Sequence, residues 1–173
     1  MIFLRHPRPE VPAGLCYGRM DVGIGADGAA DIVRAVAETP SLKRIIASPA
    51  LRCRGLAEAL ARRDGAVLSF DPRLWEMDFG DWEGLRWEVI RRGDSDPWAA
   101  DPWTNAPPGG ETFAAVHARV AETIGEAGPG TGIICHAGPI RAARMILTGA
   151  HFKTVFAEPV PYATPIQFVQ ECA

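Results

Sequence analysis

Residues 1–7 read MIFLRHP and join a short apolar run to an arginine, a histidine and a proline. The run from Ile2 to Leu4, closed by Pro7, is typical of a buried strand that stops abruptly. Ligands of open α/β sheets bind outside the carboxyl ends of the strands. The stretch therefore brings Arg5 and His6 to an expected ligand site, where arginine can donate to an anion and histidine can act as base, ligand or nucleophile. Taken alone, it is equally compatible with two solvated polar residues.

Beyond this stretch, strand and helix patterns alternate along the chain. Apolar runs predict strands at 42–47, 66–70 and 131–135, and helix-favouring segments predict helices at about 28–38, 51–63, 112–127 and 139–148. This alternation indicates an α/β fold, a three-layer α/β/α sandwich around a mostly parallel sheet. The tail from Phe152 to Val169 predicts one or two further strands broken by prolines.

The middle of the chain follows a different pattern. Residues 74–84, LWEMDFGDWEG, are dense in carboxylates and aromatic rings, and we expect a helix after them to about Arg91. Segments without sustained periodicity are expected as loops, at 8–28 and 94–110. In the second loop, Trp98 and Trp103 would either pack on an aromatic part of a ligand or hold the segment down.

Composition limits the classes of function. With 173 residues, we expect a single domain over residues 1–173. A net charge of −3 makes nucleic acid a poor partner, and no apolar run is long enough to span a bilayer. The first residues do not resemble a signal peptide, so the expected location is cytoplasmic. Four scattered cysteines indicate free thiols rather than a disulfide framework or a zinc site: Cys16, Cys53, Cys135 and Cys172.

Three expected strands end in similar chemistry. The first ends at Arg5 and His6, the second is followed by Arg52 and Arg54, and the last is followed by His136. All three ends would lie at one edge of a parallel sheet, where helix N-termini add N–H donors and a favourable dipole. The combination predicts a phosphate site. Singly, the arginines could be solvated helix charges and His136 a hydrogen-bonded core histidine.

Five motifs occur in order along the chain. They are Leu4-Arg5-His6-Pro7, Ser48-Pro49-Ala50-Leu51-Arg52, Glu76 ahead of Phe79-Gly80-Asp81-Trp82-Glu83-Gly84, Pro108-Gly109-Gly110-Glu111, and His136-Ala137-Gly138-Pro139-Ile140-Arg141. On these motifs the chain resembles the histidine phosphatase family, whose members share the phosphoglycerate mutase-like fold. Residues 15–18 and 76–84 most resemble the α-ribazole phosphatase branch, which acts in cobalamin biosynthesis.

The resemblance implies a role for each matched residue. His6 would attack phosphorus and become phosphohistidine, while Arg5, Arg52 and His136 would hold the phosphoryl oxygens. Glu76 would protonate the leaving alcohol and then activate water, with Asp78 as the rival acid. Residues expected to contact substrate are Tyr17, Gly18, Arg19 and Ala137, together with Arg5, Arg52 and His136. The implied substrate is a small phosphate ester such as α-ribazole 5′-phosphate, with no metal or other cofactor, and the chain could form a homodimer.

The chain departs from the family pattern at two places. Pro7 replaces the glycine after the nucleophile, which removes an N–H and favours an extended His6. Gly55 and Leu56 stand where the family has a threonine after the second arginine segment. The first departure bears on activity, and the second on packing near Arg52.

Four other functions remain open at this level. Cys135 and Arg141 fit C-x₅-R, the loop of cysteine-dependent phosphatases, although Pro139 deletes an amide that such a loop needs. A phosphoglycerate mutase is disfavoured by the short chain, and a phosphate-ester binding module without turnover by the presence of both His6 and Glu76. A metal hydrolase would have to use His6, His117, His136 and His151, whose spacing matches no known ligand set.

Overall fold

The computed structural model describes residues 1–168 of the chain. Val169, expected in a strand, and Cys172, expected as a free thiol, lie outside these residues. Within the described range, no helix combines the length and apolarity that a membrane span requires.

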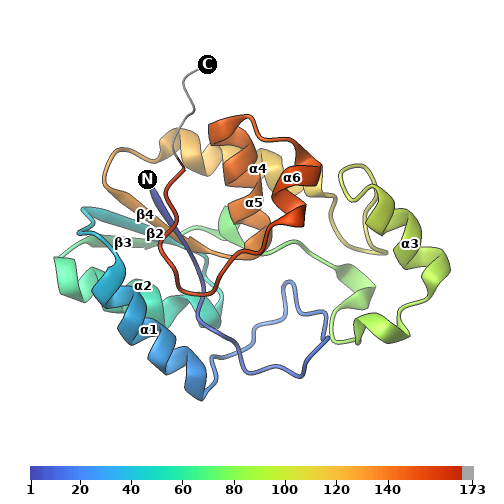
Figure 1. The fold of residues 1–173 in the computed structure, drawn as a ribbon, viewed down its shortest axis with the longest axis horizontal. Helices are drawn as coiled ribbons and strands as arrows, with labels where there is room; N and C mark the ends of the chain where they lie inside the picture. The colour runs from blue at the N-terminus through green and yellow to red at the C-terminus, as the bar shows by residue number, and fades with distance from the viewer. Residues whose placement is uncertain (169–173) are drawn as a thin grey trace.

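Four parallel strands form the sheet (Figure 1). They are β1 (Ile2–Arg5), β2 (Arg44–Ala47), β3 (Val67–Phe70) and β4 (Thr131–Cys135), in the spatial order β1-β4-β2-β3. Arg5 pairs with Cys135, and Ala47 pairs with Ile134. The carboxyl ends of β1, β2 and β4 therefore meet at one edge, as the sequence predicts.

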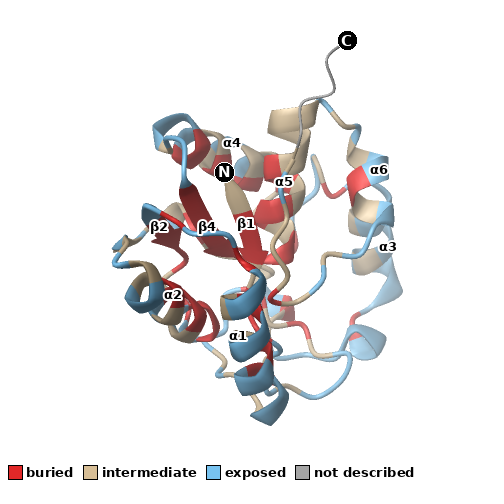
Figure 2. Ribbon diagram, turned by 60° about the vertical axis from the view of Figure 1, so that its left-hand side comes forward, coloured by how far each residue is buried: buried red, intermediate tan, exposed pale blue. Residues whose placement is uncertain are grey.

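Helices cover both faces of the sheet, which confirms the three-layer α/β/α fold (Figure 2). One face carries α1 (Ala26–Glu38) and α2 (Leu51–Asp64), and the other carries α4 (Phe113–Glu126) and α5 (Ala137–Thr148). The four predicted helices thus form, with bounds shifted by a few residues.

Alternate strand residues serve the two faces. Phe3 and Ile133 pack in the core under α4 and α5, whereas Leu4 and Ile134 pack against α1 and α2. A parallel sheet covered on both sides needs apolar residues at consecutive positions, because successive side chains point to opposite faces. This is why the short runs at residues 2–4 and 133–134 are apolar without interruption.

The prediction for the tail was partly wrong. A helix, α6 (Phe152–Ala157), forms where a strand was expected. Beyond it, Ile166 pairs antiparallel with Phe3 and Tyr162 bridges Arg5, so the tail runs beside β1 without building a full strand. Prolines at 159, 161 and 165 remove the N–H groups that a continuous ladder would need.

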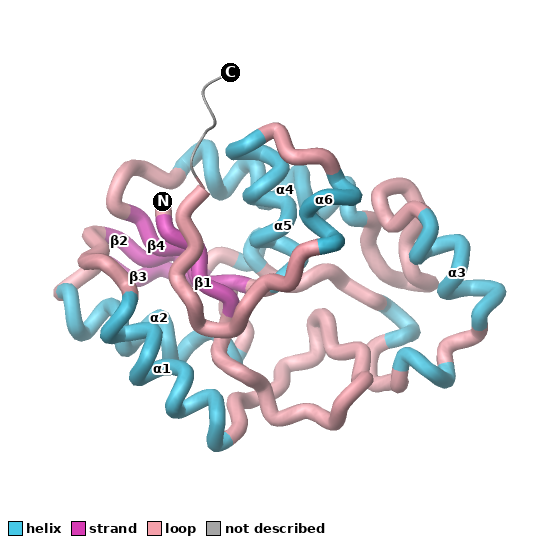
Figure 3. The backbone as a smooth tube through the Cα atoms, viewed as in Figure 1, coloured by secondary structure: helices cyan, strands magenta, loops and turns pink. Residues whose placement is uncertain are grey.

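The helix expected after Gly84 does not form. Residues 72–89 instead contain three single 3₁₀ turns, η1 (Pro72–Leu74), η2 (Gly80–Trp82) and η3 (Trp87–Val89). The N–H of Trp87 donates to Gly14 O at 2.9 Å, and Leu85 O accepts from Cys16 N–H at 2.9 Å. Backbone groups that an α-helix would use internally are therefore bonded to the long loop after β1 (Figure 3).

The loop expected at 94–110 also needs correction, since α3 (Arg92–Ala100) occupies its first part. This helix contains Pro97, although proline in a helix interior removes a backbone hydrogen bond. Trp98 packs edge-on against Phe79 and Trp82, with ring centroids 5.8 and 5.5 Å apart. Tertiary packing of the tryptophan outweighs the proline, which supports the expectation that Trp98 holds this segment down.

Candidate active site

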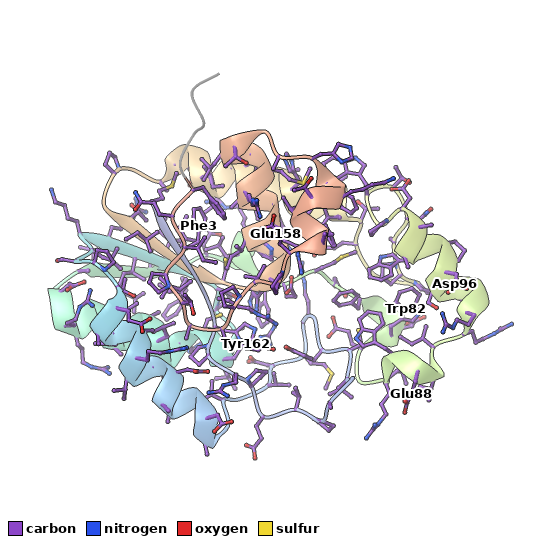
Figure 4. All side chains as sticks on the ribbon, in the orientation of Figure 1. Phe3, Trp82, Glu88, Asp96, Glu158 and Tyr162 are labelled. Atoms are coloured by element: carbon purple, nitrogen blue, oxygen red, sulfur yellow. The ribbon has the colours of Figure 1, made fainter. Side chains whose placement is uncertain are left out.

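The carboxyl edge of the sheet brings two buried histidines together. His6 follows β1 and His136 follows β4, and their ring centroids are 5.2 Å apart. Tyr162, from the segment after α6, lies 5.5 Å from the His6 ring (Figure 4). Both histidines are almost fully excluded from solvent.

The hydrogen bond of His6 fixes which ring nitrogen carries the proton. Nδ1 lies 2.7 Å from the carbonyl oxygen of Pro7, which can only accept, so Nδ1 must donate. The lone pair of a neutral ring is then on Nε2. Burial, followed by the positive charge of Arg52, holds the pKa of His6 well below its ordinary value. His6 is therefore a neutral imidazole with a nucleophilic Nε2 at physiological pH.

His136 has partners on both ring nitrogens. Arg52 donates from Nε to Nδ1 at 3.2 Å, so the proton of the neutral ring is on Nε2 and is donated to Ser48 Oγ at 2.8 Å. Trp75 stacks on the same ring, at 6.3 Å between centroids and 5° between planes. Burial, followed by the neighbouring His6 and Arg52, holds the pKa of His136 well below its ordinary value.

Arg52 is the largest fully buried side chain of the described residues. Besides its bond to His136, it donates to Gly18 O at 2.6 Å and to Met20 O at 2.7 Å, and it lies 5.4 Å from the centre of the Tyr17 ring. Three of the five guanidinium N–H groups are thus used, which leaves one on each terminal nitrogen for a ligand. A buried cation with spare donors beside two neutral histidines is suited to an anion.

Arg5 supplies a second cation. It donates to Val160 O at 2.8 Å and to the hydroxyl of Tyr162 at 3.0 Å, and its guanidinium lies 3.8 Å over the Tyr162 ring. Its Nε is buried and has no hydrogen-bond partner among the described residues. Because an unpaired buried donor is costly, this nitrogen points to an anionic ligand.

Glu76 lies at the N-terminus of α5. Its Oε1 accepts from Gly138 N–H at 3.0 Å and from its neighbour Met77 N–H at 3.0 Å. A Cβ on Gly138 would overlap Oε1, so only glycine permits this approach. The backbone of Glu76 is fixed by Arg119, which donates to Glu76 O at 3.1 Å and forms an ion pair with Glu111 at 2.8 Å. The Glu76 carboxyl is thus fixed against the backbone of Gly138, which follows His136 by two residues in the chain.

Asp78, the rival acid, has a different environment. It accepts from Gly80 N–H at 2.9 Å and lies 3.7 Å from Nε of Arg19. Its side chain is about one-third exposed, and Arg19 is 41% exposed. Asp78 therefore shapes the loop at residues 78–80, whereas Glu76 faces the helix end beside His136.

The expected substrate-contacting residues are divided between the site and its rim. Tyr17 is close to Arg52, and its hydroxyl is 3.4 Å from that of Tyr162. Burial, followed by the bond to Tyr162, raises the pKa of Tyr17 to about 12. Ala137 is the first residue of α5 and is buried. The side chain of Arg19 contacts the carboxylates of Asp78 and Glu111, at 3.7 and 3.5 Å.

Arg54 does not join the site. Its Nε donates to Pro49 O at 2.9 Å, and its guanidinium lies over the Phe70 ring on the surface. This agrees with the interpretation of Arg54 as a solvated helix charge.

The cysteine-dependent alternative finds no support in the geometry. Cys135 is buried in β4, and burial raises the pKa of its thiol well above the ordinary value, which favours an unreactive thiol. Arg141 would have to grip phosphate, but it donates to Val155 O at 3.1 Å and to Glu158 O at 3.4 Å. The two residues of the motif thus serve the packing of β4 and α6.

The four histidines do not form one cluster. His117 lies in α4 against Trp103, and His151 precedes α6. Within residues 1–168, no three side chains of metal-ligating type are grouped as a metal site requires. Of the four histidines, only His6 and His136 share a site.

Two residues of the site were missed by sequence reasoning. Tyr162 anchors Arg5 and flanks His6, and Trp75 covers His136. Tyr162 lies between Pro161 and Ala163 in a tail without periodicity, so no local pattern marked it. A signal was available for Trp75, because it directly precedes Glu76.

Comparison with known proteins gives a family match over most of the chain. The model of the histidine phosphatase superfamily (branch 1) matches residues 1–169. Among curated relatives, a bifunctional protein of Mycobacterium tuberculosis, Rv2228c, is 29% identical over 153 residues, 82% of this chain and 42% of that protein. A glucosyl-3-phosphoglycerate phosphatase of the same organism is 33% identical over 135 residues, 73% of this chain and 59% of that protein. The chain thus spans about half the length of these relatives.

Solved structures show the same fold. The mycobacterial glucosyl-3-phosphoglycerate phosphatase Rv2419c superposes with a TM-score of 0.77 and 27% identity, over 91% of this chain and 82% of that chain. An Escherichia coli protein proposed to be an alpha-ribazole-5′-P phosphatase gives a TM-score of 0.84 over 95% of this chain and 86% of that chain. At 20% identity, the second likeness concerns the fold alone.

Proposed function

Because the chain belongs to branch 1 of the histidine phosphatase superfamily, we propose that it hydrolyses small phosphate monoesters through a phosphohistidine formed on His6. The observation that carries the proposal is the orientation of His6. Its Nδ1–H is bound to Pro7 O, so the lone pair of the neutral ring is on Nε2, beside the buried Arg52 and the partly buried Arg5. A neutral nucleophile next to fixed cations is what phosphoryl transfer from an anionic ester requires.

The reaction has two halves. Nε2 of His6 attacks phosphorus as the ester P–O bond breaks, and Glu76 in its acid form gives a proton to the leaving oxygen. Water then attacks the phosphohistidine, with the Glu76 carboxylate taking its proton, so that phosphate leaves and His6 is restored. Arg5 and the free N–H groups of Arg52 stabilise the charge on the phosphoryl oxygens in both steps. The chain supplies the nucleophile, acid and cations from its own side chains.

We infer for His136 a role that differs from the one implied by the resemblance. Both of its ring nitrogens are already bonded, to Arg52 and Ser48. We propose that His136 positions Arg52 before a substrate binds and contacts a phosphoryl oxygen only if one of these bonds is exchanged. Removal of His136 would then act mainly through Arg52.

The test is hydrolysis of 4-nitrophenyl phosphate in the presence of a chelator. We expect wild type and Cys135→Ser to be active and His6→Ala to lose activity, while rapid acid-labile labelling of wild type by a ³²P-ester would trap phosphohistidine. Loss of activity in Cys135→Ser with retention in His6→Ala would replace the proposal by the cysteine mechanism. Tight binding of the ester without turnover would favour the binding module.

The substrate is proposed from two directions. Residues 15–18 and 76–84 resemble the α-ribazole phosphatase branch, which suggests α-ribazole 5′-phosphate and a role in cobalamin biosynthesis. The mycobacterial relatives suggest glucosyl-3-phosphoglycerate instead. Mutase activity remains the less favoured alternative. We further propose that residues 1–173 are one domain. The proposed location is the cytoplasm, without nucleic-acid or membrane partners. We also propose that the protein can form a homodimer.

A further inference from the structure

A groove of about 720 Å³ adjoins the proposed phosphate site. Its walls come from the loop after β1, the first turn of α1, Tyr17 and Tyr162. Tyr162 belongs to both places, because its hydroxyl binds Arg5 and its ring lies 5.5 Å from that of His6. Figure 4 shows Tyr162 near the centre of the molecule, where the tail passes the loop after β1. An ester held at His6 can therefore extend its organic part past Tyr162.

The volume suits a small organic molecule rather than a phosphate group alone. Pockets for such ligands are typically about 300–1,000 Å³. One wall carries Val11, Pro12 and Leu15, which offer an apolar surface, and the tyrosines offer rings and hydroxyls. The groove is thus large enough and mixed enough to hold a sugar, a base or both.

Charge limits what the groove can hold. Its single lining cation is Arg8, whose Nε and Nη2 face Asp31 at 3.0 and 3.2 Å and whose Nη1 faces Asp27 at 3.3 Å. Each of the three guanidinium nitrogens already faces a carboxylate. Glu10 adds a second lining carboxylate, and no ion pair links it to another described residue. The groove is therefore lined by one positive side chain, Arg8, and two negative ones, Glu10 and Asp27, which leaves a net negative charge.

The cations just outside the groove are also engaged. Arg34 pairs with Asp31 at 3.1 Å, and Arg19 lies 3.7 Å from Asp78 and 3.5 Å from Glu111. Arg5 and Arg52 remain for the phosphate itself. A second anionic group on the substrate would be repelled by the carboxylates that line the groove. The lining holds no arginine that is free of an ion pair to compensate.

We propose that this groove binds the organic part of the substrate and selects phosphomonoesters whose organic part is neutral or cationic, against those that carry a second negative charge. The inference rests on the proposed phosphatase function and narrows its substrate class. It favours a phosphorylated sugar or nucleoside over a phosphorylated carboxylic acid. One unit charge at about 6 Å, with an effective dielectric constant of about 40 to 80, changes binding about three- to tenfold.

The experiment compares two aryl esters of the same size, 4-hydroxymethylphenyl phosphate and 4-carboxyphenyl phosphate. The two substituents change the acidity of the leaving phenol similarly, so a difference in kcat/KM reports the groove. We expect wild type to prefer the hydroxymethyl ester about three- to tenfold at low salt. The preference should shrink towards unity in about 1 M sodium chloride, where the screening length is about 3 Å.

Two variants identify the charges responsible. Glu10→Gln and Asp27→Asn should each lower the ratio of kcat/KM for the hydroxymethyl ester to that for the carboxy ester about threefold or more. The matched control is Glu38→Gln, at the other end of α1 and about 16 Å from Asp27 along the helix axis, which should change neither value.

Binding of phosphonates separates the inference from the function on which it rests. By calorimetry, 4-hydroxymethylbenzyl phosphonate should bind wild type about three- to tenfold more tightly than 4-carboxybenzyl phosphonate. If no ester is hydrolysed but this order holds, the phosphatase proposal fails and the groove inference stands. If the esters are hydrolysed while both phosphonates bind equally, or the carboxy compound binds better, the groove inference is overturned. If neither phosphonate binds and no ester is hydrolysed, the phosphatase proposal and the groove inference are both wrong.

Discussion

Nε of Arg52 donates to Nδ1 of His136 across 3.2 Å, in a region from which solvent is excluded. Guanidinium N–H groups cannot accept, so this contact assigns the lone pair of His136 to Nδ1 and its proton to Nε2. The proton is then donated to Ser48 Oγ at 2.8 Å. Ser48, His136 and Arg52 thus form a chain in which the serine, the first residue after β2, orients the arginine proposed to hold phosphate.

The first prediction concerns Ser48, as a positioning residue. Ser48→Ala removes the acceptor of the Nε2 proton and leaves a buried donor unpaired, which costs about 1–3 kcal/mol. We expect kcat to fall about tenfold, with a smaller change in KM, because Arg52 is less well placed for the transition state. The ¹⁵N chemical shift of His136 Nε2 should move from its wild-type value in the variant, because the Nε2–H loses its acceptor, while the Arg52 bond keeps the lone pair on Nδ1.

The control for this variant is Ser69→Ala. Ser69 lies in β3 and bonds Ile45 O at 3.5 Å, with no contact to the site. It should leave kcat and the His136 shifts unchanged. A Ser48→Ala protein with unaltered His136 shifts and kcat would show that the serine does not orient the ring.

The second prediction concerns Gly138 in the first turn of α5. Alanine normally stabilises a helix relative to glycine by about 0.8–1 kcal/mol. Here its Cβ would overlap Oε1 of Glu76, so we expect Gly138→Ala to displace the carboxyl and lower kcat about 10²-fold. The free energy of unfolding, from urea titration, should not show the gain that alanine gives at an open helix position, because the displaced carboxyl loses its bond to the Gly138 N–H.

Gly125→Ala is its matched control. Gly125 lies in α4, and nothing is within 4 Å of the Cβ it would acquire. We expect this variant to be more stable than wild type by about 0.5–1 kcal/mol, with unchanged kcat. Equal stabilisation by the two alanines would mean that Glu76 does not approach α5 as closely as described.

Sequence reasoning located the site because parallel strands end at a common edge. Arg5 is the last residue of β1, and His6 and His136 directly follow β1 and β4, so their convergence required only the strands and their direction. Arg52 lies one helical turn beyond β2 and was found in the same way. The alternation of strand and helix patterns along the chain likewise predicted the three layers of the fold.

The failures have a different physical origin. Residues 85–91 have a helical pattern, but their backbone bonds the loop at 14–16, and no local period reveals a partner 70 residues away in the chain. Residues 94–110 lack sustained periodicity, and α3, which contains Pro97, depends on Trp98 packing against other aromatic rings. Tyr162 acts through Arg5, at the opposite end of the chain. Each missed feature depends on long-range contacts.

The third prediction follows from the lowered pKa values of His6 and His136. An unfolded histidine titrates near about 6.5, so below that pH the unfolded chain binds protons that the folded chain does not. The free energy of unfolding should be flat above about pH 6.5 and fall as pH decreases, by up to about 1.4 kcal/mol per pH unit for each histidine. Urea titrations between about pH 5 and 8 measure this slope.

His6→Gln tests the assignment. Glutamine does not titrate, so the slope below about pH 6.5 should lose up to about 1.4 kcal/mol per pH unit, with the contribution of His136 remaining. A slope identical to that of wild type would mean that His6 is not held neutral by its burial and by Arg52.

The last prediction distinguishes the two candidate acids. Glu76→Gln keeps an acceptor for the Gly138 N–H but cannot supply a proton, so hydrolysis of an alkyl phosphate, whose leaving group needs protonation, should fall about 10²–10⁴-fold. With 4-nitrophenyl phosphate, the initial burst of nitrophenolate, which reports formation of the phosphohistidine, should fall far less, because nitrophenolate leaves without a proton; the turnover that follows the burst still needs Glu76 as base. Asp78→Asn should lower both activities alike and modestly, since it loosens the contact between Asp78 and Arg19. If Asp78→Asn instead shows the selective loss with alkyl esters, Asp78 is the acid, and the position of Glu76 at the end of α5 serves that helix alone.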